Sequence, residues 1–494
     1  MTMKQLKKQN HTKVALFAGA AALMTLTPNT HAQSSVDALL NKLEQKGILT
    51  VEEARELKAE NQQDSAADLN KAFNSNISMP DWVTGYKLYG DFRGRFDELT
   101  TDSPGIPGTK GNPGTGLSSQ DRIRLRYRLR VGLTINMKDD LQVGFRLGSG
   151  DASGVGSQSS AGSPLSNNTT MQDNGTKKMI YIDAAYGKWT AINDGTWMLA
   201  ATIGKMDQPF QVSQMVFDSD YTPEGAALQG SYKINDNHSL AVNGAAFVLD
   251  EVASSARDPF MYGAQAIWNA NWTPRIASSL GIGVFNIVNK GALGLSGFIA
   301  NTNNYNPGGV PNVNYGNTRN STTGNLVYNY NPIVASASAT YTLDSFPLYN
   351  GKFPIKLSGE YMNNPGAHPA KGPDNNQGYW GGITFGKSGK KGTWDIFYRY
   401  QYLEADAWYD EVVDDDNVAF YVNNNSTTVP KSGWFSGTNM KGHLVKFNYS
   451  LTDSLTLTLT AYLNELIKLN QNIGKLGEPK NNALHFMADL MWKF

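Results

Sequence analysis

Five arginines alternate with apolar residues in the stretch RIRLRYRLR at 122–130. A strand sends alternate side chains to opposite faces, whereas the turn of a helix would scatter the guanidinium groups around the cylinder. The pattern therefore predicts a strand with one apolar face and one basic face, formed by Arg122, Arg124, Arg126, Arg128 and Arg130. Taken alone, the segment also fits a soluble antiparallel sheet with its polar face in water.

The start of the chain carries a signal for export. Four lysines precede the apolar run VALFAGAAALMTL, and small residues follow at Thr30 and Ala32. This is the pattern of a secretory signal peptide over residues 1–32, cleaved after Ala32, and its apolar run is too short to span a bilayer. Without the signal peptide the chain has 39 basic and 43 acidic residues, so its net charge is slightly negative. Neither a polyanion nor a nucleic-acid partner is therefore expected.

The composition of the exported chain favours a β-barrel. The chain has no cysteine, and its 49 glycines, 23 tyrosines, 20 phenylalanines and 10 tryptophans accompany a negative mean hydropathy. Beyond the signal peptide no apolar run reaches the roughly 18 residues of a membrane helix. A membrane strand needs only about ten alternating residues, so a low mean hydropathy is compatible with insertion as strands.

Alternation recurs along residues 81–494 and predicts an all-β, transmembrane antiparallel barrel of sixteen strands, with eighteen as the alternative. The predicted strands lie near 85–96, 122–135, 141–148, 179–189, 197–206, 226–234, 239–249, 260–269, 275–286, 326–342, 353–362, 377–386, 393–403, 440–451, 455–464 and 483–494. Short links such as MKDD and TDS alternate with long loops rich in Gly, Ser, Asn and Pro. In membrane barrels the short turns are periplasmic and the long loops external, so both ends of the barrel are expected in the periplasm.

The cost of placing arginine in lipid determines which face of the strand points into the barrel. An arginine on the lipid face at mid-bilayer costs about 2–4 kcal/mol, so five would consume a typical net stability of about 5–15 kcal/mol. The arginines are therefore expected to face inward, where a sixteen-strand barrel encloses an aqueous channel. Arg93, Arg95 and Arg146 on the flanking strands are expected to widen this basic, pore-lining wall.

The end of the chain, LHFMADLMWKF, places apolar residues on one face and stops on Phe494. It resembles the terminal strand of bacterial outer-membrane barrels, in which a C-terminal aromatic is read by the barrel assembly machinery. The resemblance implies that Phe494 and Trp492 form an assembly signal.

Residues 33–80 are predicted to form a short periplasmic helical hairpin and linker. Gly47 ends the first helix, and Thr50 with Glu53 caps the second. Two interpretations stand side by side, a spacer and a site of oligomerisation or periplasmic attachment. The second would make the protein a structural outer-membrane tether.

The segment GKMDQPFQVSQMVFDSDYTPEGAALQ at 204–229 resembles the putative porin family of Gram-negative bacteria. The resemblance extends to KGILTVEEARELKAE, YRYQYLEADAWYD and the terminal strand, and the hairpin is also similar to the one preceding phosphate-selective porins. It implies a passive outer-membrane channel for small hydrophilic solutes, surrounded by lipid and lipopolysaccharide, with a homotrimer as a candidate assembly and no cofactor.

Within this segment, Asp218, Asp220 and Glu224 are expected on a loop that folds into the lumen. Opposite an arginine wall they would create a transverse field at a constriction. Equally, they could cap turns or hold a structural cation, and Asp414–Asp416 could be solvated or bind calcium. With three carboxylates against eight arginines we expect a mild anion preference. Phosphate or another specific substrate is the alternative; a sugar channel would need an aromatic track, for which Tyr89, Trp380 and Tyr462 are candidates.

Enzyme chemistry has little support in the sequence. Two of the six histidines fall in the signal peptide, and none has metal-ligand spacing with another. His443 and His485 lie on predicted strands that are not neighbours. We therefore expect no catalytic site and no bound metal.

Overall fold

The computed structural model describes residues 80–101, 121–151, 163–252, 255–294, 314–320, 324–369, 374–421, 433–468 and 482–494. The predicted signal peptide and, but for its last residue, the predicted helical hairpin lie outside these ranges. Residues Trp82–Phe494 form one compact unit. Among the described residues, no helix is long and apolar enough to cross a membrane.

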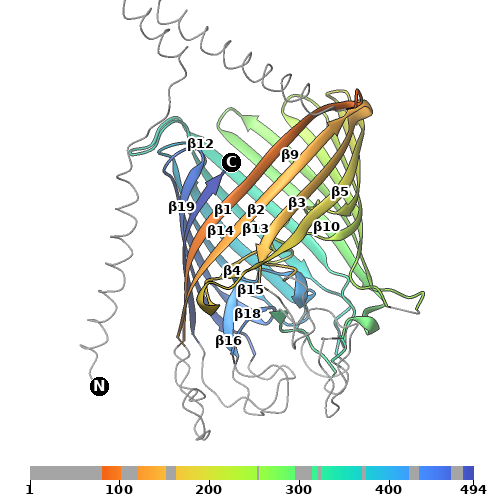
Figure 1. Cartoon of the computed structure of the whole chain (residues 1–494), viewed down its shortest axis with the longest axis vertical. Helices are drawn as coiled ribbons and strands as arrows, with labels where there is room; N and C mark the ends of the chain where they lie inside the picture. Colours follow the sequence, from red (N-terminus) through yellow and green to blue (C-terminus); the bar gives the residue numbers. More distant parts are fainter. Residues whose placement is uncertain are drawn as a thin grey trace, which may run out of the picture. The chain divides into compact units, whose positions relative to one another are not determined.

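Sixteen antiparallel strands close into a barrel when β1 pairs with β20 (Figure 1). This confirms the predicted fold class and strand number. The barrel strands are β1 (Val83–Thr101), β2 (Arg122–Met137), β3 (Leu141–Gly150), β5 (Met179–Asn193), β6 (Trp197–Lys205), β7 (Glu224–Lys233), β8 (His238–Val248), β9 (Phe260–Thr273), β10 (Ile276–Val288), β12 (Ile333–Leu343), β13 (Phe353–Asn363), β14 (Gln377–Gly386), β15 (Trp394–Leu403), β18 (Met440–Ser450), β19 (Leu455–Leu466) and β20 (Ala483–Lys493).

Shorter elements lie in the connections. The two-residue strand β4 (Thr169–Thr170) pairs with β2. A separate three-stranded sheet contains β11 (Asn314–Tyr315), β16 (Val418–Tyr421) and β17 (Gly433–Gly437). Single 3₁₀ turns occur at η1 (Lys138–Asp140), η2 (Asp173–Gly175), η3 (Lys290–Ala292) and η4 (Asp410–Val412).

Alternation along β2 produces the two predicted faces. Ile123, Leu125 and Leu129 point outward and are 41–49% exposed, whereas Arg128 points inward and is buried. Residues of like orientation meet across the antiparallel register, so Arg93 of β1 lies opposite Arg128 and Arg95 opposite Arg126. The arginine segment is therefore a barrel strand with its basic side in the interior.

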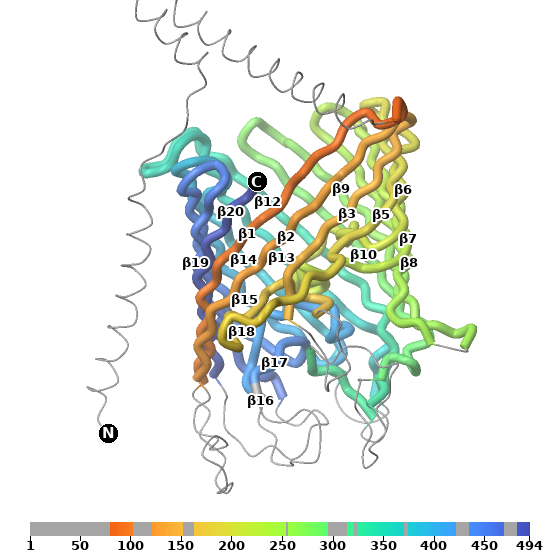
Figure 2. The backbone as a smooth tube through the Cα atoms, viewed as in Figure 1, coloured from red at the N-terminus to blue at the C-terminus, as the bar shows by residue number. Residues whose placement is uncertain are grey.

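Short turns gather at one end of the barrel, and the described parts of the longer connections lie at the other (Figures 1 and 2). The turn at 138–140 is tight because Asp139 and Asp140 adopt positive φ, a conformation that Asp tolerates better than most residues. One predicted strand, 326–342, starts too early. The strand begins at Ile333, because Leu326 and Tyr330 are instead buried in a core inside the barrel.

The last residue completes the seam between β20 and β1. The Phe494 amide donates to the Gly90 carbonyl at 3.1 Å, and the Gly90 amide donates to the Phe494 carbonyl at 2.8 Å. A Cβ on Gly90 would lie 2.6 Å from the Phe494 ring, so the ring packs there only because residue 90 has no side chain. Two residues further along each strand, Trp492 packs against Phe92 with ring centroids 5.7 Å apart.

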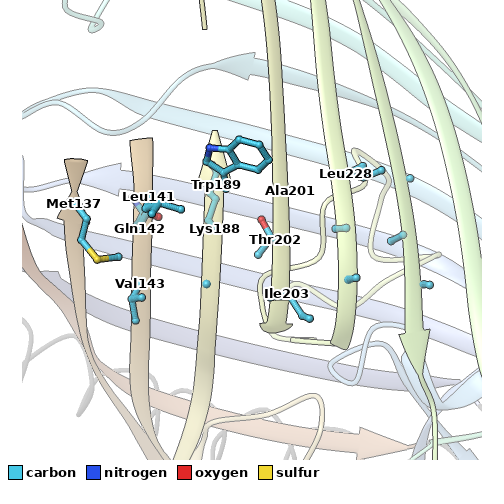
Figure 3. Close-up of a pocket in the computed structure, with 16 residues that line it drawn as sticks. Met137, Leu141, Gln142, Val143, Lys188, Trp189, Ala201, Thr202, Ile203 and Leu228 are labelled. Carbon is cyan, nitrogen blue, oxygen red and sulfur yellow. The ribbon is translucent and has the colours of Figure 1, made fainter. Parts of the chain in front are cut away.

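The outer wall carries an apolar groove of about 810 Å³ across β3 and β5 to β8 (Figure 3). Small residues such as Gly187, Ala201 and Gly244 form its floor, and Leu141 and Trp189 stand at neighbouring positions of paired strands. Most of these groups are apolar, as expected for a surface in contact with hydrocarbon.

Candidate functional site: a charged constriction in the lumen

The loop at 206–223, between β6 and β7, makes hydrogen bonds to inward side chains of the barrel wall. Its Gln211 amide donates to Gln265 of β9 at 2.9 Å, and the Gln265 side chain donates back to the Gln211 carbonyl at 2.9 Å. Further along, the Ser213 amide donates to Glu360 of β13 at 2.9 Å. The barrel wall thus supplies the hydrogen bonds that hold the loop inside.

A second infolded segment, residues 404–417 after β15, packs against this loop. The Trp408 indole donates to the Val216 carbonyl at 2.8 Å, and the Asp218 amide donates to the Val412 carbonyl at 2.8 Å. Together the two loops and the inward faces of β8 to β10 and β12 to β15 enclose a hydrophobic core that includes Phe210, Met215, Phe217, Phe247, Phe285, Tyr330, Met362 and Trp408. This part of the barrel interior is therefore filled rather than aqueous.

Both loops reach the arginine wall through aspartates. Asp220 lies 3.1 Å from Arg128 and 3.2 Å from Arg130. Asp416 lies 2.9 Å from Arg95 of β1. The loops therefore narrow the lumen to the side formed by β1, β2 and β18 to β20.

The wall also carries its own carboxylates, which the predicted charge ratio did not count. Asp91 pairs with Arg128 at 2.9 Å and with Arg130 at 2.7 Å. Asp97 pairs with Arg124 at 3.0 Å and Arg126 at 3.4 Å, and Asp489 pairs with Arg95 at 2.7 Å. The signal was present, since Asp91 and Asp97 share the inward parity of Arg93 and Arg95 on the same strand.

The remaining arginines of the predicted wall are placed less uniformly. Arg146 of β3 pairs with Asp183 of β5 and, at 2.7 Å, with Asp207 of the loop at 206–223. Arg93 donates to Asn168 at 2.7 Å and keeps a long ion pair of 3.8 Å with Asp489. Arg122 is exposed and forms no ion pair with the described part of the chain.

The expected ratio of three carboxylates to eight arginines is therefore wrong. Seven carboxylates form ion pairs with seven of the eight arginines, all except Arg122, and these carboxylates are Asp91, Asp97, Asp183, Asp207, Asp220, Asp416 and Asp489. Because buried guanidinium groups need partners, carboxylates accompany them on the same and adjacent strands. The arginines form a largely neutralised network rather than a bare ladder.

Of the three predicted loop carboxylates, only Asp220 contacts the arginine wall. Glu224 is the first residue of β7, has an exposed side chain and pairs with Lys205 at 3.2 Å. Asp218 is buried, and its carboxylate lies within 4.8 Å of those of Asp414 and Asp415. These three side chains make a seam of like charge between the two loops.

Burial and the neighbouring carboxylates of Asp415 and Asp414 hold the pKa of Asp218 well above its usual range. Burial likewise raises the pKa of Asp415, with Asp416 next to it. Asp220 and Asp416 differ because they face cations. Burial alone would raise the pKa of Asp416, but Arg95 and His485 bring it below its usual range.

Beside the infolded loops the lumen retains a cavity of about 370 Å³. Its charged lining consists of five cations and three carboxylates, Arg93, Arg95, Arg128, Arg130, Lys446, Asp220, Asp416 and Asp489. Hydroxyl and amide groups, among them Ser219, Asn448, Thr458, Thr460 and Tyr462, line much of the rest. The cavity can hold a small hydrophilic, net anionic solute.

The three aromatic residues considered for a sugar track do not line up. The Tyr89 ring covers Gly132 on the inner face of β2. Trp380 donates to Glu360 at 2.9 Å, and Tyr462 donates to Asp414 at 3.0 Å. Each therefore has a separate place in the interior, and two of them help to fix the loops.

A family model described as "Putative porin" matches residues 107–306, which include the segment at 204–229. The resemblance to putative porins is confirmed over this range. No match to a curated protein was found.

Among solved structures, the chain is similar to Pseudomonas putida OprB at high pH, with 12% identity, a TM-score of 0.48 and coverage of 83% of this chain and 94% of that one. Pseudomonas aeruginosa OpdQ has 10% identity and a TM-score of 0.37, and the match covers 84% of this chain and 99% of that one. A triple mutant of Rhodopseudomonas blastica porin has 9% identity and a TM-score of 0.36, and the match covers 83% of this chain and 100% of that one. At such low identities and scores, function has to be argued from the residues of this chain.

Proposed function

We propose that the chain forms a water-filled channel in the bacterial outer membrane through which small hydrophilic solutes diffuse passively, with a mild preference for anions. The observation that carries the proposal is the closed barrel with an apolar outer face and a charged cavity in its lumen. Ile180, Ile182 and Ile203 are 63–70% exposed on the outside. Such a surface is stable only when hydrocarbon covers it.

The proposed anion preference rests on the balance of charge in the cavity. Its lining carries five cations against three carboxylates. Since most of the arginines are paired with carboxylates, the preference is smaller than eight unpaired arginines would give. It should also weaken as salt rises, because a Debye length of about 8 Å at physiological ionic strength screens charges across the lumen.

The cellular setting belongs to the same proposal. The chain is exported after cleavage behind Ala32, inserts among lipid and lipopolysaccharide, and is folded by the barrel assembly machinery, which reads Phe494 and Trp492. A homotrimer is the proposed assembly. The match to a family of porins favours a channel over an enzyme.

Swelling of proteoliposomes tests the proposal. Vesicles containing the folded protein should swell in isotonic solutions of small sugars and amino acids, at rates that fall with solute size. The matched control is vesicles with protein unfolded before reconstitution. If vesicles with a folded barrel exclude even the smallest solutes, the channel is absent and the tether through residues 33–80 becomes the better account.

A further inference from the structure

Lys446 of β18 stands out among the cations of the lumen cavity. It lines the cavity, yet it forms no ion pair or hydrogen bond with any residue that the structure describes. The arginines on the opposite side are engaged, because Arg95, Arg128 and Arg130 each contact two carboxylates. Asp414 and Asp416 attract Lys446 electrostatically but lie beyond ion-pair distance. An anion in the cavity therefore finds at Lys446 a cation without a short ion pair.

The neighbours of Lys446 are groups that bind hydroxyls. Thr460 lies directly opposite Lys446 in the pairing of β18 with β19, and Thr458 lies opposite Asn448 two residues along. All four residues line the cavity. The Thr458 hydroxyl donates to Asn448 at 2.6 Å, so its oxygen still has lone pairs for a solute.

Arg93 supplies a second, weaker attraction. Its ion pair with Asp489 is 3.8 Å long, compared with 2.7 Å for the pair between Arg95 and the same carboxylate. Both Arg93 and Lys446 line the cavity. An anion there is attracted by two cations that lack a short ion pair, so its binding displaces no short ion pair.

We propose that this cavity binds small polyhydroxylated monocarboxylates, such as sugar acids, with the carboxylate at Lys446 and the hydroxyls at Thr458, Thr460 and Asn448. The proposal rests on the channel function proposed above and names the class of solute that the channel favours. A volume of about 370 Å³ lies at the small end of ligand pockets, roughly 300–1,000 Å³.

Phosphate fits this cavity less well. Recognition of a phosphate group is strongest through several guanidinium groups that can donate in pairs. Three of the four arginines here already contact two carboxylates each, whereas Lys446 offers a single charge beside hydroxyls. The geometry therefore favours a singly charged, hydroxylated solute.

Block of single-channel chloride current by D-gluconate tests the proposal. In wild-type channels gluconate should reduce the current at lower concentration than acetate, inorganic phosphate or neutral sorbitol. Lys446→Gln should weaken the block by gluconate about tenfold, the loss expected for one charge-assisted hydrogen bond. Lys441→Gln, on the same strand but paired with Glu465 away from the cavity, is the control and should leave the block unchanged.

A second variant separates hydroxyl recognition from charge. Thr458→Val with Thr460→Val should weaken the block by gluconate but not by acetate, and it keeps the test available if Lys446→Gln does not fold. Equal block by acetate and gluconate, stronger block by phosphate, or unchanged block in Lys446→Gln would overturn the proposal. Each of these three outcomes is measured on channels that still conduct chloride, so it contradicts only the proposed solute. A folded protein without any chloride current would instead contradict the proposed channel function.

Discussion

At the scale of single residues, the charge of the proposed constriction depends on which carboxylates form ion pairs with its arginines. Asp220 contacts both Arg128 and Arg130, while Glu224 of the same sequence segment pairs with Lys205 elsewhere. Asp220→Asn should therefore free positive charge in the lumen and shift the reversal potential in a KCl gradient toward anions. Glu224→Gln is the matched control. Similar shifts in the two variants would show that Asp220 is not part of the constriction.

The arginines themselves make the opposite prediction. Arg126→Gln combined with Arg128→Gln removes two positive charges from the lumen, so the reversal potential should move toward cations, most clearly at low salt. Because Asp97 is fully buried and loses one of its two arginine partners, the variant should also unfold at a lower temperature. An unchanged reversal potential in folded protein would mean that these arginines serve only to hold the loops.

The buried carboxylate of Asp218 predicts a dependence on pH. Its pKa is raised in the folded protein by burial and by Asp415 and Asp414, so its protonated form is favoured at the seam between the loops. This contribution to stability is complete below the ordinary carboxyl pKa, about 4, and is lost as the pH rises through the raised value.

Single-channel recordings over a range of pH provide the measurement. The loops should be less firmly held as the pH rises, giving noisier single-channel currents, and Asp218→Asn should reduce this change, with Asp415 accounting for what remains. Noise that grows instead on acidification would contradict the sign of the shift.

At the scale of elements, the strands were predictable because lipid permits few alternatives. Every strand must be apolar outside, so period-two alternation survives even in a loose sequence such as IVASASATYTL, which forms β12. The infolded loops were only partly predictable. Trp408 and Tyr330 lie in segments without periodicity, and nothing in their local sequence shows that they join Phe217 in one core.

The same limit applies to the candidate site. The inward parity of the arginines follows from alternation, but the pairing of Asp416 with Arg95 joins residues more than three hundred positions apart. Only the closed barrel with its folded loops brings them together. Lys446 was not selected at all, because its significance lies in the partner that it lacks among the described residues.

The seam between β20 and β1 leads to a prediction about assembly. Deleting Phe494 removes two backbone hydrogen bonds to Gly90 and the packing of the Phe494 ring over that glycine. The amount of folded barrel in the membrane, measured by heat-modifiable gel mobility, should fall, while surviving channels keep their conductance. Normal amounts of folded protein would show that Phe494 is dispensable for assembly.

At the scale of the whole molecule, the barrel interior is divided between a hydrophobic core and a charged passage. The core joins the loops to β8 to β10 and β12 to β15, and the charged cavity lies beside β1, β2 and β18 to β20. Solutes that cross the proposed channel would therefore pass the ion-pair network. Because most of its charges are paired, we expect the proposed selectivity to be mild rather than absolute.

The reversal potential of single channels in a KCl gradient tests this account most directly. Folded wild-type protein in a planar bilayer should conduct, and its reversal potential should lie on the anion side of zero and approach zero as the total salt rises. Absence of conductance, or a reversal potential on the cation side at low salt, would contradict the account.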